Sequence, residues 1–352
     1  MNKRQITLSD LAKELGISTA TVSRALKDYP DISQETKRKV LALAQKLNYR
    51  PNTIAAGLRK QESRVIGVII PEIVNHFFSS VIKGIMQVAY DADYRVMLCQ
   101  SDESYEKEVA DANALFNSRV DGLLVSLAHH TKSFTHFEEF LNAGTPLVFF
   151  DKVPQADSMA KTSKVAVNDY EGAYQMVSHL IQQGATRIAH LRGPMSAYTS
   201  QKRYEGYCQA LEDHTLPLDP ELVFDTVEIT MDEGRQFARK LINVSGGCDA
   251  IFCITDKVAI GVIDALKSEG VRVPEDILVA GFSDWQVSAV VDPPLSSVAQ
   301  PSLEMGKKAM ELLLTEINAA KNNLEVKHQF IELTTQLKLR TSSTRNAVAE
   351  TL

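Results

Sequence analysis

The apolar residues of the first fifty positions recur at helical spacing in three short segments. The apolar positions are Leu8, Leu11, Ala12 and Leu15, then Val22, Ala25 and Leu26, then Val40, Leu43, Ala44 and Leu47. Each set would lie on one face of an amphipathic helix. Thr7, Ser18 and Ser33 stand where N-caps belong, and Asp10 completes a capping box with Thr7. Gly16 ends the first helix, so the first two helices are predicted to form a helix-turn-helix.

From Val65 onward the pattern changes to short apolar or β-branched runs separated by amphipathic stretches of helix length. The runs are 65–70, 95–99, 122–126, 147–150, 165–167, 188–191, 250–254 and 278–281. This alternation predicts parallel sheets of the doubly wound α/β type. Because about 280 residues is too long for one such unit, we expect two subdomains that divide near Val167.

The segment that joins the two regions, Pro51–Arg59, is too short for a stable helix on its own. Isolated helices below about 12–15 residues are marginal, and Gly57 lowers the helical propensity further. We therefore expect this connector to need a partner in order to become helical.

Composition places the chain among ordinary globular proteins. It has 352 residues, of which 44% are hydrophobic and 23% charged. No apolar run approaches the roughly 18 residues that span a bilayer, and the N-terminus lacks a signal-peptide core, so we expect a cytoplasmic protein without a membrane partner. Cys99, Cys208, Cys248 and Cys253 lack zinc-ligand spacing, which favours buried thiols and no structural metal.

The net charge of −6 is unevenly divided along the chain. Residues 1–64 hold 13 Lys and Arg against 6 Asp and Glu, a charge of +7, so the remaining 288 residues carry −13. A short basic head on an acidic body is typical of a small module that binds a polyanion.

The second predicted helix suits a DNA groove. Its outward residues Thr19, Ala20 and Ser23 are small, and Arg24 is the exception. Lys37–Lys39 at the start of the third helix are placed for phosphates. The alternative is a helical hairpin that packs on the larger domain; the basic charge and terminal position favour DNA.

Three ordered motifs resemble the headpiece of the LacI/GalR repressors: 7–12, 16–24 and 47–52. The resemblance implies that Thr19, Ala20 and Arg24 address base edges, while Thr7, Ser18, Thr21, Ser23 and Ser33 lie near the backbone. It also makes the connector a hinge helix, with Asn52 at its start, Ala55 at a small position, and Leu58 as the leucine that two paired hinges insert into the minor groove. Bulkier residues are common in the family at positions 19 and 20, so operator sequences do not transfer.

Further motifs in family order extend the resemblance over residues 6–340. It implies a small all-α helix-turn-helix headpiece followed by an α/β periplasmic-binding-protein-like core of two doubly wound parallel-sheet subdomains. The expected bounds are 1–50 for the headpiece, 51–62 for the hinge, 63–342 for the core and 343–352 for a tail. Within the core we assign 63–166 and 299–326 to the N-subdomain, and 167–295 and 327–342 to the C-subdomain.

Ligands of open α/β sheets bind beyond the carboxyl ends of the strands. This rule selects 75–78, Ser126, Asp151, 192–199, Thr255–Asp256 and 283–285, the loops in which the family binds its effector. The effector contacts we predict are Phe77, Phe78, Ser126, Asp169, Thr199, Arg203, Thr255, Ser283 and Asp284.

Four of these residues, and the neighbouring Trp285, also have a structural alternative. Phe77 and Phe78 would then be core, Arg203 a surface ion pair, Asp169 a helix cap, and Trp285 rim packing. Ser283 and Thr255 depart from common family residues, so effector identity does not carry over.

Signatures of catalysis such as GxxxxGK[ST], HExxH and GxSxG are missing from the sequence. We therefore expect no enzyme and no cofactor. The predicted function is that of a homodimeric transcriptional regulator, a repressor by preference, which binds a palindromic double-stranded operator and responds to a small-molecule effector, a sugar or sugar derivative. The alternatives are a sugar-binding protein or carbohydrate enzyme of the same bilobal shape, and an activator or a regulator that binds a protein partner.

Overall fold

The computed structural model describes residues 6–49, 62–74, 76–155, 159–244 and 246–345. The chain divides into two compact units, Met1–Arg64 and Val65–Leu352. Each unit has its own hydrophobic core.

The described residues of the first unit form three helices, α1 (Leu8–Leu15), α2 (Thr19–Leu26) and α3 (Gln34–Lys46). The side chains of Thr7, Ser18 and Ser33 cap them, and Thr7 and Asp10 form the predicted capping box. Gly16 ends α1 in the left-handed conformation, at φ 63°. The predicted apolar faces meet in one core around the fully buried Leu11, Val22 and Val40.

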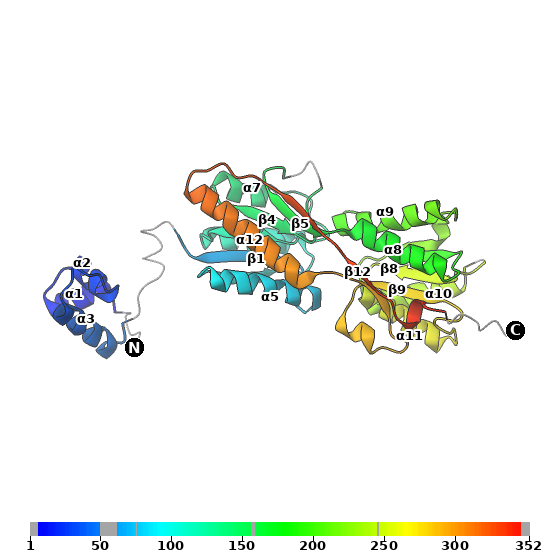
Figure 1. Cartoon of the computed structure of the whole chain (residues 1–352), viewed down its shortest axis with the longest axis horizontal. Helices are drawn as coiled ribbons and strands as arrows, with labels where there is room; N and C mark the ends of the chain where they lie inside the picture. The colour runs from blue at the N-terminus through cyan, green and yellow to red at the C-terminus, as the bar shows by residue number, and fades with distance from the viewer. Residues whose placement is uncertain (1–5, 50–61, 75, 156–158, 245, 346–352) are drawn as a thin grey trace. The chain divides into compact units, whose positions relative to one another are not determined.

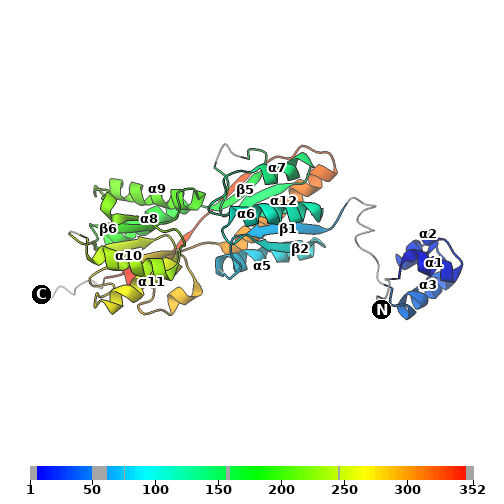
Figure 2. The same cartoon turned by 180° about the vertical axis from the view of Figure 1, so that it is seen from behind.

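The second unit begins with a six-stranded parallel sheet in the order β11-β5-β4-β3-β1-β2. Its strands are β1 (Val65–Ile70), β2 (Arg95–Gln100), β3 (Gly122–Val125), β4 (Leu147–Phe150), β5 (Ser163–Val167) and β11 (Phe330–Leu333). Helices α5 (His76–Asp91) and α12 (Ser302–Lys321) cover one face, as Figure 1 shows. On the other face lie α6 (Tyr105–Asn117) and α7 (Thr135–Asn142), which are seen from behind in Figure 2.

A second six-stranded sheet follows in the order β12-β10-β9-β8-β6-β7. Its strands are β6 (Ile188–Arg192), β7 (Val223–Asp225), β8 (Ala250–Cys253), β9 (Leu278–Ser283), β10 (Ser296–Ala299) and β12 (Gln336–Lys338). Helices α8 (Asp169–Gln182) and α9 (Tyr198–Asp213) cover one face, and α10 (Met231–Ile242) and α11 (Asp256–Ser268) the other. Three short 3-10 helices, η1 (Pro220–Leu222), η2 (Gln286–Ala289) and η3 (Thr341–Ser343), complete the described elements.

The chain passes between the two sheets three times, after β5, after β10 and after β11. The first two crossings follow the last residues of β5 and β10, Val167 and Ala299. The third differs from our expectation: β11 pairs with β5 in the first sheet, so residues 330–333 belong to the N-subdomain and the crossing follows Leu333. The prediction of purely parallel sheets also needs one correction, because β12 runs antiparallel to β10 at an edge.

Helices α5 and α12 touch backbone to backbone. A Cβ atom built on Gly306 would lie 2.0 Å from the carbonyl oxygen of Val81, and one on Gly84 would lie 2.3 Å from that of Leu303. Only glycine permits such an approach, and it lets the two helices cover the first sheet as one layer.

Candidate functional site

The outward face of α2 is the candidate DNA-reading surface. Thr19, Ala20 and Arg24 are exposed, whereas Thr21 and Ser23 are half-buried. The Ser18 hydroxyl accepts a hydrogen bond from the Thr21 amide at 3.0 Å, and Ser33 caps α3 in the same way. The hydroxyls predicted to lie near the DNA backbone therefore also fix the starts of the helices.

Arg24 is held in place by neighbours of the turn that follows α2. Its Nη2 lies 2.6 Å from the Asp31 carboxylate, and its guanidinium lies 5.4 Å from the centre of the Tyr29 ring. Because the pair is exposed, exchanging Asp31 for a base edge has a small cost.

Lys37 corrects one expectation about phosphate contacts. Its side chain is only 8% exposed, and its Nζ lies 2.7 Å from the Asp28 carboxylate. The lysine therefore belongs to the headpiece core, which leaves Arg38 and Lys39 on the surface, with Lys39 paired to Glu35. The hinge positions Asn52, Ala55 and Leu58 lie outside the described residues.

The carboxyl ends of the strands in the second unit carry unusual backbone conformations. Asp102 and Glu103 after β2, Asp151 after β4, and Ser283 and Asp284 at the end of β9 all have positive φ between 49° and 107°. Left-handed backbone in residues other than glycine costs free energy and clusters at functional sites. Their position at the strand ends is consistent with a candidate ligand site in these loops.

Arg203 and Asp169 form a buried ion pair at this edge. Arg203 Nε donates to Asp169 Oδ1 at 2.8 Å, Nη1 donates to the Ile254 carbonyl at 2.7 Å, and the guanidinium lies over the Phe282 ring. Burial raises the pKa of the Asp169 carboxyl, and the charge of Arg203 opposes that shift. Neither structural alternative applies: the pair is buried rather than on the surface, and Asn168, not Asp169, caps α8.

Asp151 is a second buried carboxyl, and Ser126 Oγ lies 3.4 Å from its Oδ2. Burial raises the pKa of Asp151 to about 7, while the neighbouring Lys152 charge acts in the opposite direction. The carboxyl is therefore able to change between donor and acceptor roles near neutral pH.

This shift predicts a pH dependence of stability. Because the pKa of Asp151 is higher in the folded chain than in the unfolded chain, its contribution to stability is full below about pH 4 and declines as the pH rises to about 7. Asp151→Asn should remove that slope, as measured by thermal unfolding of wild type and variant between pH 4 and 8. Glu106→Gln, which removes an exposed carboxylate of α6, is the control and should keep the slope. Equal slopes in wild type and Asp151→Asn would contradict the assignment.

The remaining predicted effector residues lie on the second subdomain. Thr199 is buried in the first turn of α9, Thr255 caps α11, and Ser283 ends β9. Asp284 Oδ1 accepts a hydrogen bond from Arg340 Nη2 at 2.7 Å. The half-buried Trp285 donates its backbone amide to the buried Asp256, so its loop is anchored to α11.

Phe77 and Phe78 are the predicted effector residues for which the structural alternative is right. They are 6% and 4% exposed, pack edge to face with centroids 5.1 Å apart, and belong to the core between α5 and the first sheet.

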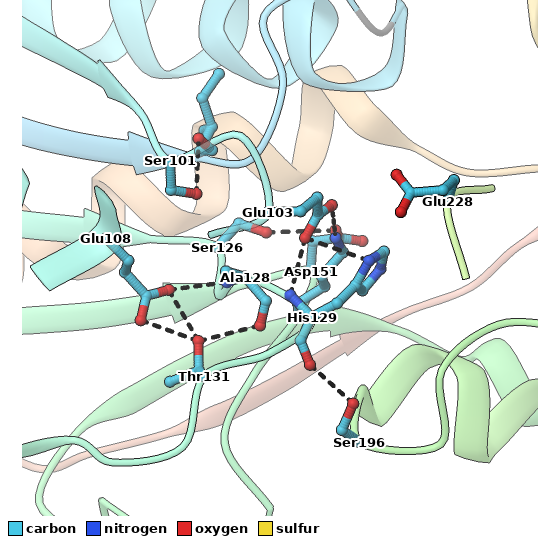
Figure 3. Close-up of polar contacts among 12 residues, drawn as sticks. Ser101, Glu103, Glu108, Ser126, Ala128, His129, Thr131, Asp151, Ser196 and Glu228 are labelled. Atoms are coloured by element: carbon cyan, nitrogen blue, oxygen red, sulfur yellow. Dashed lines mark hydrogen bonds and ion pairs between the residues drawn. The ribbon is translucent and has the colours of Figure 1, made fainter. Parts of the chain in front are cut away.

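Polar residues that the sequence analysis missed complete the cleft. They are Glu103, His129, Lys152 and Glu228. Figure 3 shows Glu103, His129 and Glu228 near Ser126 and Asp151, and Lys152 Nζ pairs with Glu103 Oε1. A cavity of about 220 Å³ between the subdomains is lined in part by Ala128, His129, Lys152, Gln155, Ser196 and Tyr198. Ser196 Oγ closes one side of it by donating to the His129 carbonyl at 2.8 Å. The strand-end rule locates Glu103 and Glu228 too, once it is applied after β2 and β7.

Among the residues that the structure describes, no group of three His, Cys, Asp or Glu side chains is arranged to hold a metal ion. Within the same residues, no helix combines the length and the apolarity that a membrane span requires.

Comparisons with known proteins agree with this geometry. The model for bacterial regulatory proteins of the lacI family matches residues 7–52, and that for periplasmic binding protein-like domains matches 177–343. The chain is 32% identical to catabolite control protein A of Priestia megaterium, over 89% of this chain and 93% of that protein. It is 25% identical to the lac repressor dimer bound to operator and the anti-inducer ONPF, with a TM-score of 0.81 over 97% of this chain and 100% of that one. The transcriptional regulator CelR in complex with cellobiose is also 25% identical, with a TM-score of 0.71 over 96% of this chain and 100% of that one.

Proposed function

The chain belongs to the lacI family of bacterial regulatory proteins, whose members are DNA-binding transcriptional regulators and not enzymes. We propose that a sugar bound in its cleft controls its affinity for a palindromic operator. The membership excludes the alternative of a sugar-binding protein or carbohydrate enzyme without DNA function. We propose a repressor that acts in the cytoplasm.

One observation carries this proposal: a single chain joins an exposed recognition helix, α2, to a polar cleft between two α/β subdomains. The first reads DNA and the second senses a ligand. The roles of Thr19, Ala20 and Arg24 at base edges, and of Asn52, Ala55 and Leu58 in the hinge, are part of the proposal.

We propose a homodimer because each chain carries a single headpiece. One helix-turn-helix reads one half-site, whereas a palindromic operator has two half-sites related by a two-fold axis. Exposed apolar residues on the second unit favour the same conclusion. Met86 and Tyr90 on α5 are 51% and 73% exposed, and Met97 lies nearby in sequence on the edge strand β2. Met86 and Tyr90 line the same surface groove, and contiguous exposed apolar side chains are typical of a protein interface.

The side chains predicted at the strand ends suit the hydroxyl groups of a sugar. Ser126, Thr199, Thr255 and Ser283 provide hydroxyls that donate or accept, and Arg203 keeps its Nη2 without a hydrogen-bond partner among the described residues. Asp169 and Asp284 provide carboxylate acceptors. The bound cellobiose of CelR is a precedent for a sugar in this fold.

The proposed mechanism uses the three connections between the subdomains as a hinge. A ligand that contacts both subdomains favours one angle between them, and this changes the spacing of the two connectors at residues 51–62 in the dimer. Coupling between ligand and DNA in such systems is typically about 1–3 kcal/mol. The sugar is an inducer if closure separates the connectors, and a corepressor if closure brings them together.

The DNA-binding part of the proposal is tested at Arg24. A guanidinium that donates two hydrogen bonds to a guanine contributes about 1–3 kcal/mol of discrimination. Arg24→Ala should therefore lose preference at one base pair in each half-site of an operator selected from random DNA by the full chain. The measurement is operator affinity for every single-base variant at one fixed salt concentration.

Arg24→Lys is the matched control, because it keeps the charge and removes the two-pronged geometry. It should keep non-specific affinity and lose the same base preference. If Arg24→Ala weakens every sequence equally, Arg24 is a phosphate contact and the proposed reading is wrong.

A further inference from the structure

We propose that the cleft selects an effector with no anionic group, and that Glu103 enforces this selection by neutralising Lys152. The inference rests on the proposed function, in which a sugar binds in the cleft. It distinguishes a free sugar from a phosphorylated sugar or a sugar acid.

The basic side chains at the strand ends are already matched by carboxylates. The pairs are Lys152 with Glu103, Arg192 with Asp225, Arg203 with Asp169 and Arg340 with Asp284. The last three have N to O distances of 2.5, 2.8 and 2.7 Å. A phosphate or carboxylate ligand is normally held by Arg or Lys donors that have no other acceptor. Among the described residues, the charge of each of these four cations is already met by a carboxylate.

Contacts with His129 hold the Glu103 carboxylate beside Lys152, where it neutralises the lysine charge. Its Oε1 pairs with Lys152 Nζ, while its Oε2 accepts a hydrogen bond from the His129 amide at 2.8 Å and lies 3.3 Å from His129 Nδ1. Glu103 and the preceding Asp102 both have left-handed backbone, with φ of 56° and 49°. Such a costly loop persists only where the surrounding contacts impose it.

The other titratable groups of the cleft add no positive charge. Burial lowers the pKa of the His129 imidazole well below its ordinary value, so the ring is neutral and adds no positive charge. Asp151 accepts a hydrogen bond from Ser126, and Glu228 points toward the Glu103 and His129 group from the opposite subdomain, as Figure 3 shows. An anionic ligand would bring like charges together, whereas the hydroxyls of a neutral sugar have both donors and acceptors to meet.

Inorganic phosphate tests this inference without knowledge of the natural sugar. Glu103→Gln keeps the shape of the side chain and frees the charge of Lys152, so calorimetry should show that this variant binds phosphate at least tenfold more tightly than wild type. Glu106→Gln is the matched control, because Glu106 is an exposed carboxylate on α6 that accepts from Ser104 rather than from Lys152. It should behave as wild type. Phosphate binding by wild type as tight as by Glu103→Gln, or no gain in that variant, would overturn the inference.

Pairs of sugars and their monophosphates provide a second test on the wild-type chain alone. Glucose, ribose and fructose are compared with glucose 6-phosphate, ribose 5-phosphate and fructose 1-phosphate by Trp285 fluorescence and operator affinity. A neutral sugar that binds at least tenfold more tightly than its phosphate supports the inference. A sugar phosphate that binds and changes operator affinity overturns the inference of a neutral effector but leaves the proposed function intact. If no sugar of either kind changes operator affinity, the proposed function loses its support, and the phosphate comparison at Glu103 still decides the inference.

Discussion

Replacing Arg203 by methionine is expected to abolish the response to effector and to lower the free energy of unfolding by about 3–5 kcal/mol. The guanidinium is the partner of the buried Asp169, so its removal leaves a carboxylate without a counter-charge. It also removes the donor that we propose for the sugar hydroxyls. Chemical denaturation at neutral pH measures the first effect, and operator binding with and without sugar measures the second.

The pH dependence of this variant separates a charge effect from lost packing. Burial raises the pKa of Asp169, and removal of Arg203 raises it further, so at low pH the carboxyl is protonated and carries no uncompensated charge. The destabilisation should therefore be largest at neutral pH and shrink as the pH falls.

Arg203→Met combined with Asp169→Asn is the matched control. It removes both charges, so it should recover much of the stability without recovering the response to sugar. A single variant Arg203→Met within about 1 kcal/mol of wild type would contradict the buried pair, since a buried unpaired carboxylate is costly.

Gly306→Ala is expected to destabilise the N-subdomain by about 3 kcal/mol, at the upper end of overpacking effects. Alanine is normally favoured over glycine in a helix by about 1 kcal/mol. Here the new methyl group would lie 2.0 Å from the Val81 carbonyl oxygen, so α12 must move away from α5. Thermal and chemical unfolding of the full chain measure the loss.

Asn318→Ala is the control in the same helix, because Asn318 is exposed and alanine there only improves helical propensity. It should be neutral or slightly stabilising. A Gly306→Ala variant as stable as Asn318→Ala would show that α5 and α12 do not touch at their backbones.

Most of the fold was predictable because its signals are local. The capping box of Thr7 and Asp10, the turn at Gly16 and the helical spacing of Leu8–Leu15 depend on residues a few positions apart, and the structure confirms them. The eight predicted runs correspond to eight of the described strands, most of them centrally placed, because buried parallel strands are continuous in apolar residues.

The missed strands are β7, β10, β11 and β12, which have three or four residues each. β7, β11 and β12 are partly exposed, and all three lie at sheet edges. Alternation over so few residues is too short to distinguish a strand from a loop. The position of β11 in the first sheet depends on its pairing with β5, far away in sequence, and no local pattern records it.

The candidate site was predicted in part, for the same physical reason. The strand-end rule located Ser126, Asp151 and Ser283 because it needs only the position of each strand. It missed Glu228, which follows the unpredicted β7. Side-chain burial was the feature hardest to predict from the sequence. The sequence alone did not show that Phe77 belongs to the core, or that Lys37 is buried and forms an ion pair with Asp28.

The central claim is that ligand in the cleft and DNA at the headpiece are coupled. The most direct measurement is the affinity of the full chain for its selected operator, by fluorescence anisotropy of labelled DNA, at zero and at saturating concentrations of the neutral sugar that binds. We predict a change of about tenfold, in either direction, as expected for a coupling of about 1–3 kcal/mol. Constant operator affinity while Trp285 fluorescence shows the cleft to be saturated would contradict the account.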